Sequence, residues 1–390
     1  MKKKNILRKI CVWSFICGIA FTATAAFAQQ ELIQQPDVVY TVNLSKTAEL
    51  NLTKEILATT EFQKFYDALT TRIDAEYDQA AKKPEFPTKL ADFLLGKVRE
   101  AIGKENISSK DVLETFAEQF ELIQVEGFVK NGYERLREID PAMAKLFAAL
   151  YMRITFVVKF HPAELGGIVE YFEDAKDKIR FELIEPDPDN FLVKFSDPNE
   201  TISVYAGSRK IENTDTYAVV FSGDTKLIEQ KLNQLQKEQN LFGENASAET
   251  FYVTHGAFDV LKQALQKAKN VTNVTKDAIR VIEQVEKVNF DTRDFNGKTG
   301  TLFQVTLSSE EAATSLKTLA EAGKVFLTFA AGSDNMDENG KKLINLILDT
   351  NIQQDGKELS AIINWSNDTV REIIKKILQD APKNVQINVL

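Results

Sequence analysis

Histidine and cysteine, the side chains that most often act as bases, nucleophiles and metal ligands, are scarce in this chain of 390 residues. It has two histidines, His161 and His255, and two cysteines, Cys11 and Cys17. Both cysteines precede residue 29, so residues 29–390 hold no thiol for a disulfide, a thiolate metal site or a cysteine nucleophile. A Ser-His-Asp triad would need one of the two histidines as its base, and no G-x-S-x-G motif accompanies them.

Each histidine follows a predicted strand at a point where a helix should begin. His161 precedes Pro162 and Glu164, which matches a helix N-cap with proline at the first helical position and an acid at the third. Ser308 and Ser366 stand in the same place after two other strands, which favours capping over catalysis. His255, in the sequence Thr-His-Gly, lies at a similar corner, and we again favour a structural role.

Three segments imitate ligand-binding motifs and fail at a decisive position. Segment 335–340 has the first half of an EF-hand loop, but Leu346 stands where the bidentate glutamate belongs. Segment 291–297 has the same defect and predicts a hairpin turn. Segment 297–299, Gly-Lys-Thr, resembles the end of a phosphate loop, but Thr292 replaces its first glycine and a strand follows. H-E-x-x-H is absent as well, so we expect neither a metal site nor a cofactor.

Carboxylates and aromatic residues leave other possibilities open. A glycosidase-type pair of acids needs neither histidine nor cysteine, but 57 acidic residues offer many pairs, and Asp187 with Asp189 is only a guess in a loop. The catalytic residues are therefore unknown. Trp365, at a predicted strand end, is expected in the core rather than on a sugar-stacking platform. Segment 325–331 is apolar and predicts a buried helical segment or buried strand, with a partner-binding surface as a third option.

The first 28 residues have the three parts of a secretory signal peptide. A basic start (Lys2 to Lys9) leads into the apolar stretch 10–21, and the segment ends in Ala26-Phe-Ala28. We expect cleavage before Gln29, a polar tether over 29–36, and a periplasmic or extracellular protein without a transmembrane segment. The remaining chain has 43 basic and 57 acidic residues, a net charge of −14, which argues against nucleic acid as a partner.

A strand that ends at a polar cap and opens a helix recurs four times. The caps are His161, Asp224, Ser308 and Ser366, and apolar residues follow each near positions +4, +8 and +11, which is one face of a helix. Each of these strands is the second arm of a hairpin. Asn296-Gly297 and Asp355-Gly356 provide two of the turns. The unit is therefore ββα.

The order of elements suggests that the chain consists of two similar halves. Segment 37–43 predicts a strand, helices are expected over 52–83, 90–102 and 109–120, and segment 250–254 with helix 257–268 resembles this opening. The first half would span 37–240, with an extra strand pair over 178–184 and 191–196, and the second half would span 248–390. The fold class is α+β, with antiparallel sheets and helices packed on one face.

Three functions remain open. The first is an exported, non-enzymatic binding or interaction module of the bacterial envelope or periplasm, whose partner would be another envelope component. The second is a carboxylate-based hydrolase of a glycan or similar polymer, and the third is a carrier of an apolar ligand in a cavity lined by phenylalanines.

Overall fold

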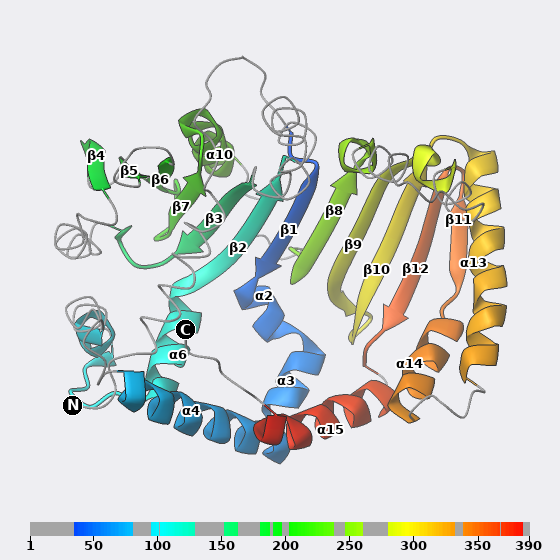
Figure 1. The fold of residues 1–390 in the computed structure, drawn as a ribbon, viewed down its shortest axis with the longest axis horizontal. Helices are drawn as coiled ribbons and strands as arrows, with labels where there is room; N and C mark the ends of the chain where they lie inside the picture. Colours follow the sequence, from blue (N-terminus) through cyan, green and yellow to red (C-terminus); the bar gives the residue numbers. More distant parts are fainter. Residues whose placement is uncertain are drawn as a thin grey trace.

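The structure, a computed structural model, describes residues 35–80, 95–100, 102–128, 152–162, 180–187, 190–196, 203–237, 246–259, 280–331, 338–366 and 368–384. In these residues, twelve strands form one antiparallel sheet in the order β11-β12-β10-β9-β8-β1-β2-β3-β7-β6-β5-β4 (Figure 1). The predicted signal peptide lies outside the described residues.

Strands from both predicted halves contribute to this sheet. Those of the first half are β1 (Val38–Asn43), β2 (Phe120–Gly127), β3 (Met152–Val158), β4 (Arg180–Asp187), β5 (Asn190–Ser196), β6 (Ser203–Lys210) and β7 (Tyr217–Ser222). Those of the second half are β8 (Glu249–Thr254), β9 (Val285–Phe295), β10 (Lys298–Leu307), β11 (Ile352–Asp355) and β12 (Glu358–Asn364). The expectation of separate sheets is wrong, because β1 pairs with β2 on one side and with β8 on the other.

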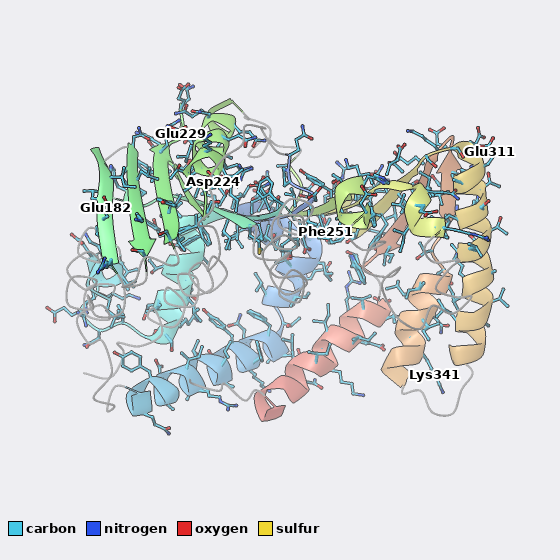
Figure 2. All side chains as sticks on the ribbon, turned by 45° about the horizontal axis from the view of Figure 1, so that its top comes forward. Glu182, Asp224, Glu229, Phe251, Glu311 and Lys341 are labelled. Atoms are coloured by element: carbon cyan, nitrogen blue, oxygen red, sulfur yellow. The ribbon has the colours of Figure 1, made fainter. Side chains whose placement is uncertain are left out.

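The helices lie on the sheet and beyond the ends of its strands. They are α2 (Leu44–Glu49), α3 (Asn51–Leu57), α4 (Thr60–Ala80), α6 (Ser109–Gln119), α10 (Thr225–Lys237), α13 (Glu310–Ala331), α14 (Glu338–Leu348) and α15 (Asp368–Asn384). Helices α4 and α15 pack against each other and form a layer away from the strands (Figures 1 and 2). No helix of the described residues is both long and apolar enough to cross a membrane.

Both faces of the sheet carry helices, which corrects the expectation of a single covered face. Ile228 and Leu232 of α10 pack against the face that holds Val220, and we call this the α10 face. Helix α13 packs with Val288 and Val305 on the opposite face, here called the α13 face. The register places the two sets on opposite sides, because directly paired residues share a face and successive residues of a strand alternate.

The predicted turns and the predicted cap at Asp224 are confirmed. Asn296 and Gly297 join β9 to β10 with φ angles of 51° and 78°, which is the geometry that a two-residue hairpin turn requires. Gly356 lies between β11 and β12 with a φ of 54°. Asp224 caps α10, because its Oδ1 accepts the backbone N–H of Lys226 at 2.9 Å. Ser108 and Asp111 cap the start of α6 reciprocally.

Other expectations about caps and burial are wrong. The cap of α13 is Ser309, whose hydroxyl accepts the N–H of Ala312 at 3.2 Å, and not Ser308. The hydroxyl of Ser366 accepts the N–H of Thr299 at 2.8 Å and so braces β10. The helix that His161 should cap lies outside the described residues. Segment 325–331 is helical, but Val325 is 56% exposed rather than buried.

Candidate functional site

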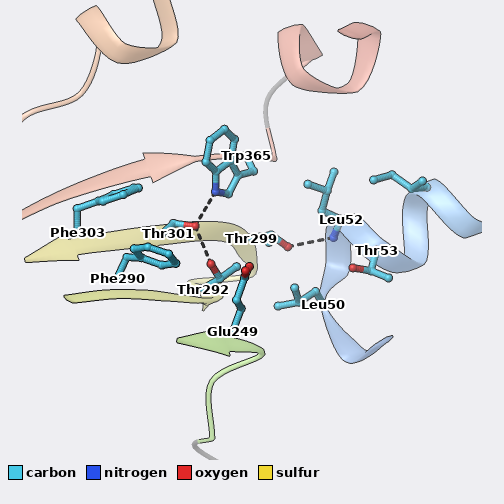
Figure 3. Close-up of a pocket in the computed structure, with 11 residues that line it drawn as sticks. Leu50, Leu52, Thr53, Glu249, Phe290, Thr292, Thr299, Thr301, Phe303 and Trp365 are labelled. Carbon is cyan, nitrogen blue, oxygen red and sulfur yellow. Dashed lines mark hydrogen bonds between the residues drawn. The ribbon is translucent and has the colours of Figure 1, made fainter. Parts of the chain in front are cut away.

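A groove of about 380 Å³ lies on the α13 face, between the sheet and helix α3 (Figure 3). Its walls come from the turn between α2 and α3, from α3 itself, from β8, β9 and β10, and from the end of β12. The lining residues are Leu50, Leu52, Thr53, Ile56, Glu249, Phe290, Thr292, Thr299, Thr301, Phe303 and Trp365. Both the volume and the largely apolar lining are typical of small-molecule sites.

Helix α3 is held over the sheet by polar contacts to the β9–β10 hairpin. The carboxylate of Asp294 accepts the N–H of Asn51, with Oδ2 at 3.1 Å, and the hydroxyl of Thr299 accepts the N–H of Leu52 at 3.0 Å. The side chain of Asn51 in turn donates to the carbonyl of Gly297 at 3.0 Å. The hairpin of the second half therefore supplies the N-terminal cap that α3 lacks in its own sequence.

Phe290 and Phe303, which line the groove, are part of a row of aromatic rings that crosses four strands. Phe251 and Phe290 are stacked with ring centres 4.8 Å apart, and Phe303 follows at 5.7 Å from Phe290. Tyr40 of β1 meets the other side of Phe251 edge-on at 6.4 Å. Figure 2 places Phe251 near the middle of the sheet. The row arises because each strand contributes an aromatic residue to the same face at the same register.

Most polar side chains in the walls already have hydrogen-bond partners within the protein. The indole Nε1 of Trp365 donates to the hydroxyl of Thr301 at 2.7 Å, and the hydroxyls of Thr301 and Thr292 lie 2.8 Å apart (Figure 3). The hydroxyl of Thr299 donates to Asp294 at 2.6 Å. A ligand that takes the donor of Trp365 or Thr299 would have to break one of these bonds, whereas an apolar ligand leaves them intact.

One carboxylate, that of Glu249, lines the groove where β8 meets β1. Its Oε1 accepts a short hydrogen bond from the phenol of Tyr40. The pKa of Tyr40 is raised to about 12, first by burial and then by the hydrogen bond and negative charge of Glu249. Tyr40 therefore stays protonated at neutral pH and keeps donating to Glu249. In the part of the chain that the structure describes, no Lys or Arg lines this groove.

The two histidines lie elsewhere and are not brought together. The ring of His161 lies 4.6 Å from that of Tyr217, beside the β3–β7 pair. His255 begins a short helix, where its Nδ1 lies 3.1 Å from the carbonyl of Val285 and its Nε2 lies 3.2 Å from Asp259. The first contact joins the helix to the start of β9 and the second lies within the helix, so neither is a side-chain cap of a backbone N–H.

Other sequence candidates also lie apart from the groove. Asp187 ends the edge strand β4, and Asp189 lies outside the described residues. Among the described residues, no group of three or more His, Cys, Asp or Glu is arranged to hold a metal ion. Residues 338–340 of the imitation calcium loop belong to α14, which begins at Glu338, and residues 335–337 lie outside the described residues.

Several described carboxyl groups have a pKa below the usual value. Lys375 lowers the pKa of Glu61, Lys104 lowers that of Asp111, and backbone N–H groups at a helix start lower that of Glu311. A glycosidase general acid needs the opposite, a carboxyl whose pKa is raised. None of these three groups fits that role.

Sequence reasoning missed the groove, although part of its signal was present. Trp365 was expected in the core, but it is partly exposed and forms a wall. Phe290 alternates with the polar residues Asn289 and Asp291, whereas Phe303 follows the apolar Leu302, so the alternation marks one face clearly only in part of the sheet. That the three strands are adjacent and that α3 lies over them follows only from the tertiary structure.

Comparison with known proteins gives structural neighbours and no family. No family model matches the chain, and no curated protein matches it. Solved structures of TP0453 are similar to it at 9% sequence identity. Crystal form III has a TM-score of 0.34 and the match covers 88% of this chain and 95% of that one. For form IV the TM-score is 0.35 and the coverage 89% and 94%, and for form I the TM-score is 0.33 and the coverage 89% and 95%.

Proposed function

We propose that this chain is an exported, non-enzymatic binding protein of the bacterial envelope that takes a single apolar chain of an amphiphilic molecule into the groove. The observation that carries the proposal is the contrast within the site. Phe290, Phe303 and Trp365 expose apolar surface to the groove, while the hydroxyls of Thr292 and Thr301 and the indole N–H are bonded to one another. Such a wall offers burial to an alkyl chain and few free hydrogen bonds to a polar ligand.

The hydrolase alternative has weaker support. It needs two carboxyl groups in one cleft, about 5 to 9.5 Å apart, one of them with a raised pKa. Glu249 is the one carboxylate among the described residues that line the groove. A binding function explains the same groove without a second acid.

We also infer that the two halves arose by duplication. The strand order supports this inference, because it runs β1-β2-β3-β7-β6 outward from the centre in one direction and β8-β9-β10-β12-β11 in the other. The strands correspond in sequence order within each half, with β4 and β5 as the extra pair. The groove then lies on the second half, and α3 of the first half closes it.

Trp365 provides the test of binding. Trp13 precedes the predicted cleavage site, so Trp365 is the single tryptophan of residues 29–390. A dodecyl probe with a bromine on its chain should quench Trp365 fluorescence saturably when titrated into this protein below its micelle concentration. Quenching that is linear in probe concentration, as in free collision, would count against the groove.

A matched pair of variants on α3 separates groove binding from surface adsorption. Ile56 lines the groove, and its neighbour Leu57 is 41% exposed and does not. Ile56→Glu should weaken probe binding by about tenfold or more, because a carboxylate would be placed in an apolar wall. Leu57→Glu should leave binding unchanged. Equal effects of the two substitutions would contradict the proposal.

A further inference from the structure

We propose that the groove selects the head group of its ligand: it accepts amphiphiles with a neutral or cationic, hydrogen-bond-donating head, such as an alcohol or an amine, and discriminates against anionic heads such as a carboxylate. This inference rests on the proposed binding function. It follows from the charge and the hydrogen-bonding state of four groups around the groove.

Glu249 is the charged group that a head would meet. Its Oε1 accepts from Tyr40, and its Oε2 has no hydrogen bond to any residue that the structure describes. A hydroxyl or ammonium head can therefore donate to Oε2. A carboxylate or phosphate head has nothing to donate there, and its own charge would be repelled at the edge of an apolar site, where water screens less.

Backbone N–H groups beside the groove, to which an anionic head could bind, are already engaged. They are the first N–H groups of the short helix α3, and they face the sheet. Here the N–H of Asn51 is bonded to Asp294 and that of Leu52 to the hydroxyl of Thr299. The protein's own carboxylate thus fills this position and adds a second negative charge near the groove.

The indole N–H donor in the wall is also engaged. The Nε1 of Trp365 is committed to Thr301, so an anionic head would gain no hydrogen bond from it without breaking an existing one. Together with the absence of Lys and Arg among the described lining residues, this leaves an anionic head no cationic partner in the described wall, whereas a donating head has Glu249 as its acceptor. The chain of the ligand and its head are therefore recognised by different parts of the site.

The experiment compares three probes with the same chain and different heads: dodecanol, dodecylamine and dodecanoate. Each competes with the brominated dodecyl probe for the protein at pH 7, with Trp365 fluorescence as the readout. We expect the dissociation constants of dodecanol and dodecylamine to be lower than that of dodecanoate by about tenfold or more. A difference of this size corresponds to the effect of one incompletely screened charge. Glu249→Gln should bring the affinity of dodecanoate to within about threefold of that of dodecanol.

A control variant removes the same charge elsewhere. Glu286 of β9 pairs with Lys357 outside the groove, so Glu286→Gln should leave the ranking of the three probes unchanged. If the probes bind equally and Ile56→Glu abolishes the binding of all three, the groove is real and head selection is wrong. Tighter binding of dodecanoate also overturns the selection. If no probe binds, the proposed function itself fails.

Discussion

The carboxylate of Asp294, on β9, accepts the backbone N–H of Asn51, the first residue of α3, across 243 positions of sequence. This bond joins the two predicted halves at the groove, because α3 belongs to one and the hairpin to the other. It also fixes the wall that carries Leu52 and Ile56. The stability of α3 and the shape of the groove are therefore properties of the same contact.

Asp294→Ala should loosen α3 and weaken ligand binding together. The loss of a helix cap costs about 0.5–2 kcal/mol of unfolding free energy, measurable by urea denaturation. Probe binding should fall in the same variant, because the wall formed by α3 is no longer held. Asp294→Asn keeps an acceptor oxygen and should lose less of both. Full binding in the alanine variant would show that α3 is positioned by other contacts.

A buried ion pair beneath α10 should be far more important to stability than the exposed pairs. Arg153 of β3 is 1% exposed, donates from Nε to Glu126 of β2 at 2.7 Å, and donates from Nη1 to the carbonyl of Leu227 at 2.7 Å. Lys231 of α10 lies 3.3 Å from the same carboxylate. Glu126→Ala removes the carboxylate from a buried guanidinium, and we expect a loss of about 3–5 kcal/mol.

The control for this pair is the exposed pair of Lys357 and Glu286, whose side chains are 53% and 45% exposed. Glu286→Ala should cost less than about 1 kcal/mol. Urea unfolding at pH 7 measures the loss of unfolding free energy in both variants. The slope of the transition is compared between the variants as well. Similar losses in the two variants would mean that the pair beneath α10 is hydrated or replaceable.

Gly207 should be required by the close approach of α10 to β6. A Cβ at this position would lie 2.5 Å from Cγ2 of Ile228 and 3.3 Å from Cδ1 of Leu232. Both neighbours belong to the buried core of the α10 face. Gly207→Ala should therefore lower the unfolding free energy by about 1–3 kcal/mol through overpacking, and thermal unfolding would detect it.

Gly323 provides the matched control for this substitution. It lies inside α13, and a Cβ there would meet nothing within 4 Å. Gly323→Ala should raise stability by about 0.5–1 kcal/mol, because alanine loses less conformational freedom in a helix. A stabilising effect of both alanines would contradict the packing of α10 against β6.

How much of this structure the sequence predicts depends on the range of the interactions. The Asn296-Gly297 turn, the Asp224 cap and the strand at 38–43 are local, and the residues themselves set the backbone geometry. Ser366 shows where this reasoning ends. Its position after a strand predicts a cap, but its hydroxyl bonds to Thr299, 67 residues away. A cap and a cross-strand brace need the same residue type.

The arrangement of strands into one sheet was beyond prediction for a similar reason. Nothing in the alternation of β1 or β8 distinguishes an edge strand from a central one, so the pairing of Val39 with Tyr252 could not be inferred. Likewise, Trp365 has the same sequence context whether it faces a core or a groove. The groove depends on the approach of α3, which is fixed by Asp294 from the other half.

The reciprocal cap at α6 should make stability depend on acid pH. Lys104, at 2.8 Å, and then Ser108 hold the pKa of Asp111 well below its usual value. A carboxyl with a lowered pKa in the folded state stabilises fully above its unfolded pKa of about 3.9 and loses this effect as the pH falls below that value. Asp111→Asn should therefore destabilise the protein at pH 7 and destabilise it less at pH 3.

Ser108→Ala should also destabilise α6 at pH 7, by about 1 kcal/mol, because it removes the hydroxyl that caps the N–H of Asp111. Urea unfolding of the parent protein and the two variants at pH 7 and pH 3 measures these losses of stability. If Asp111→Asn costs the same unfolding free energy at both pH values, the charge of Asp111 does not stabilise the fold.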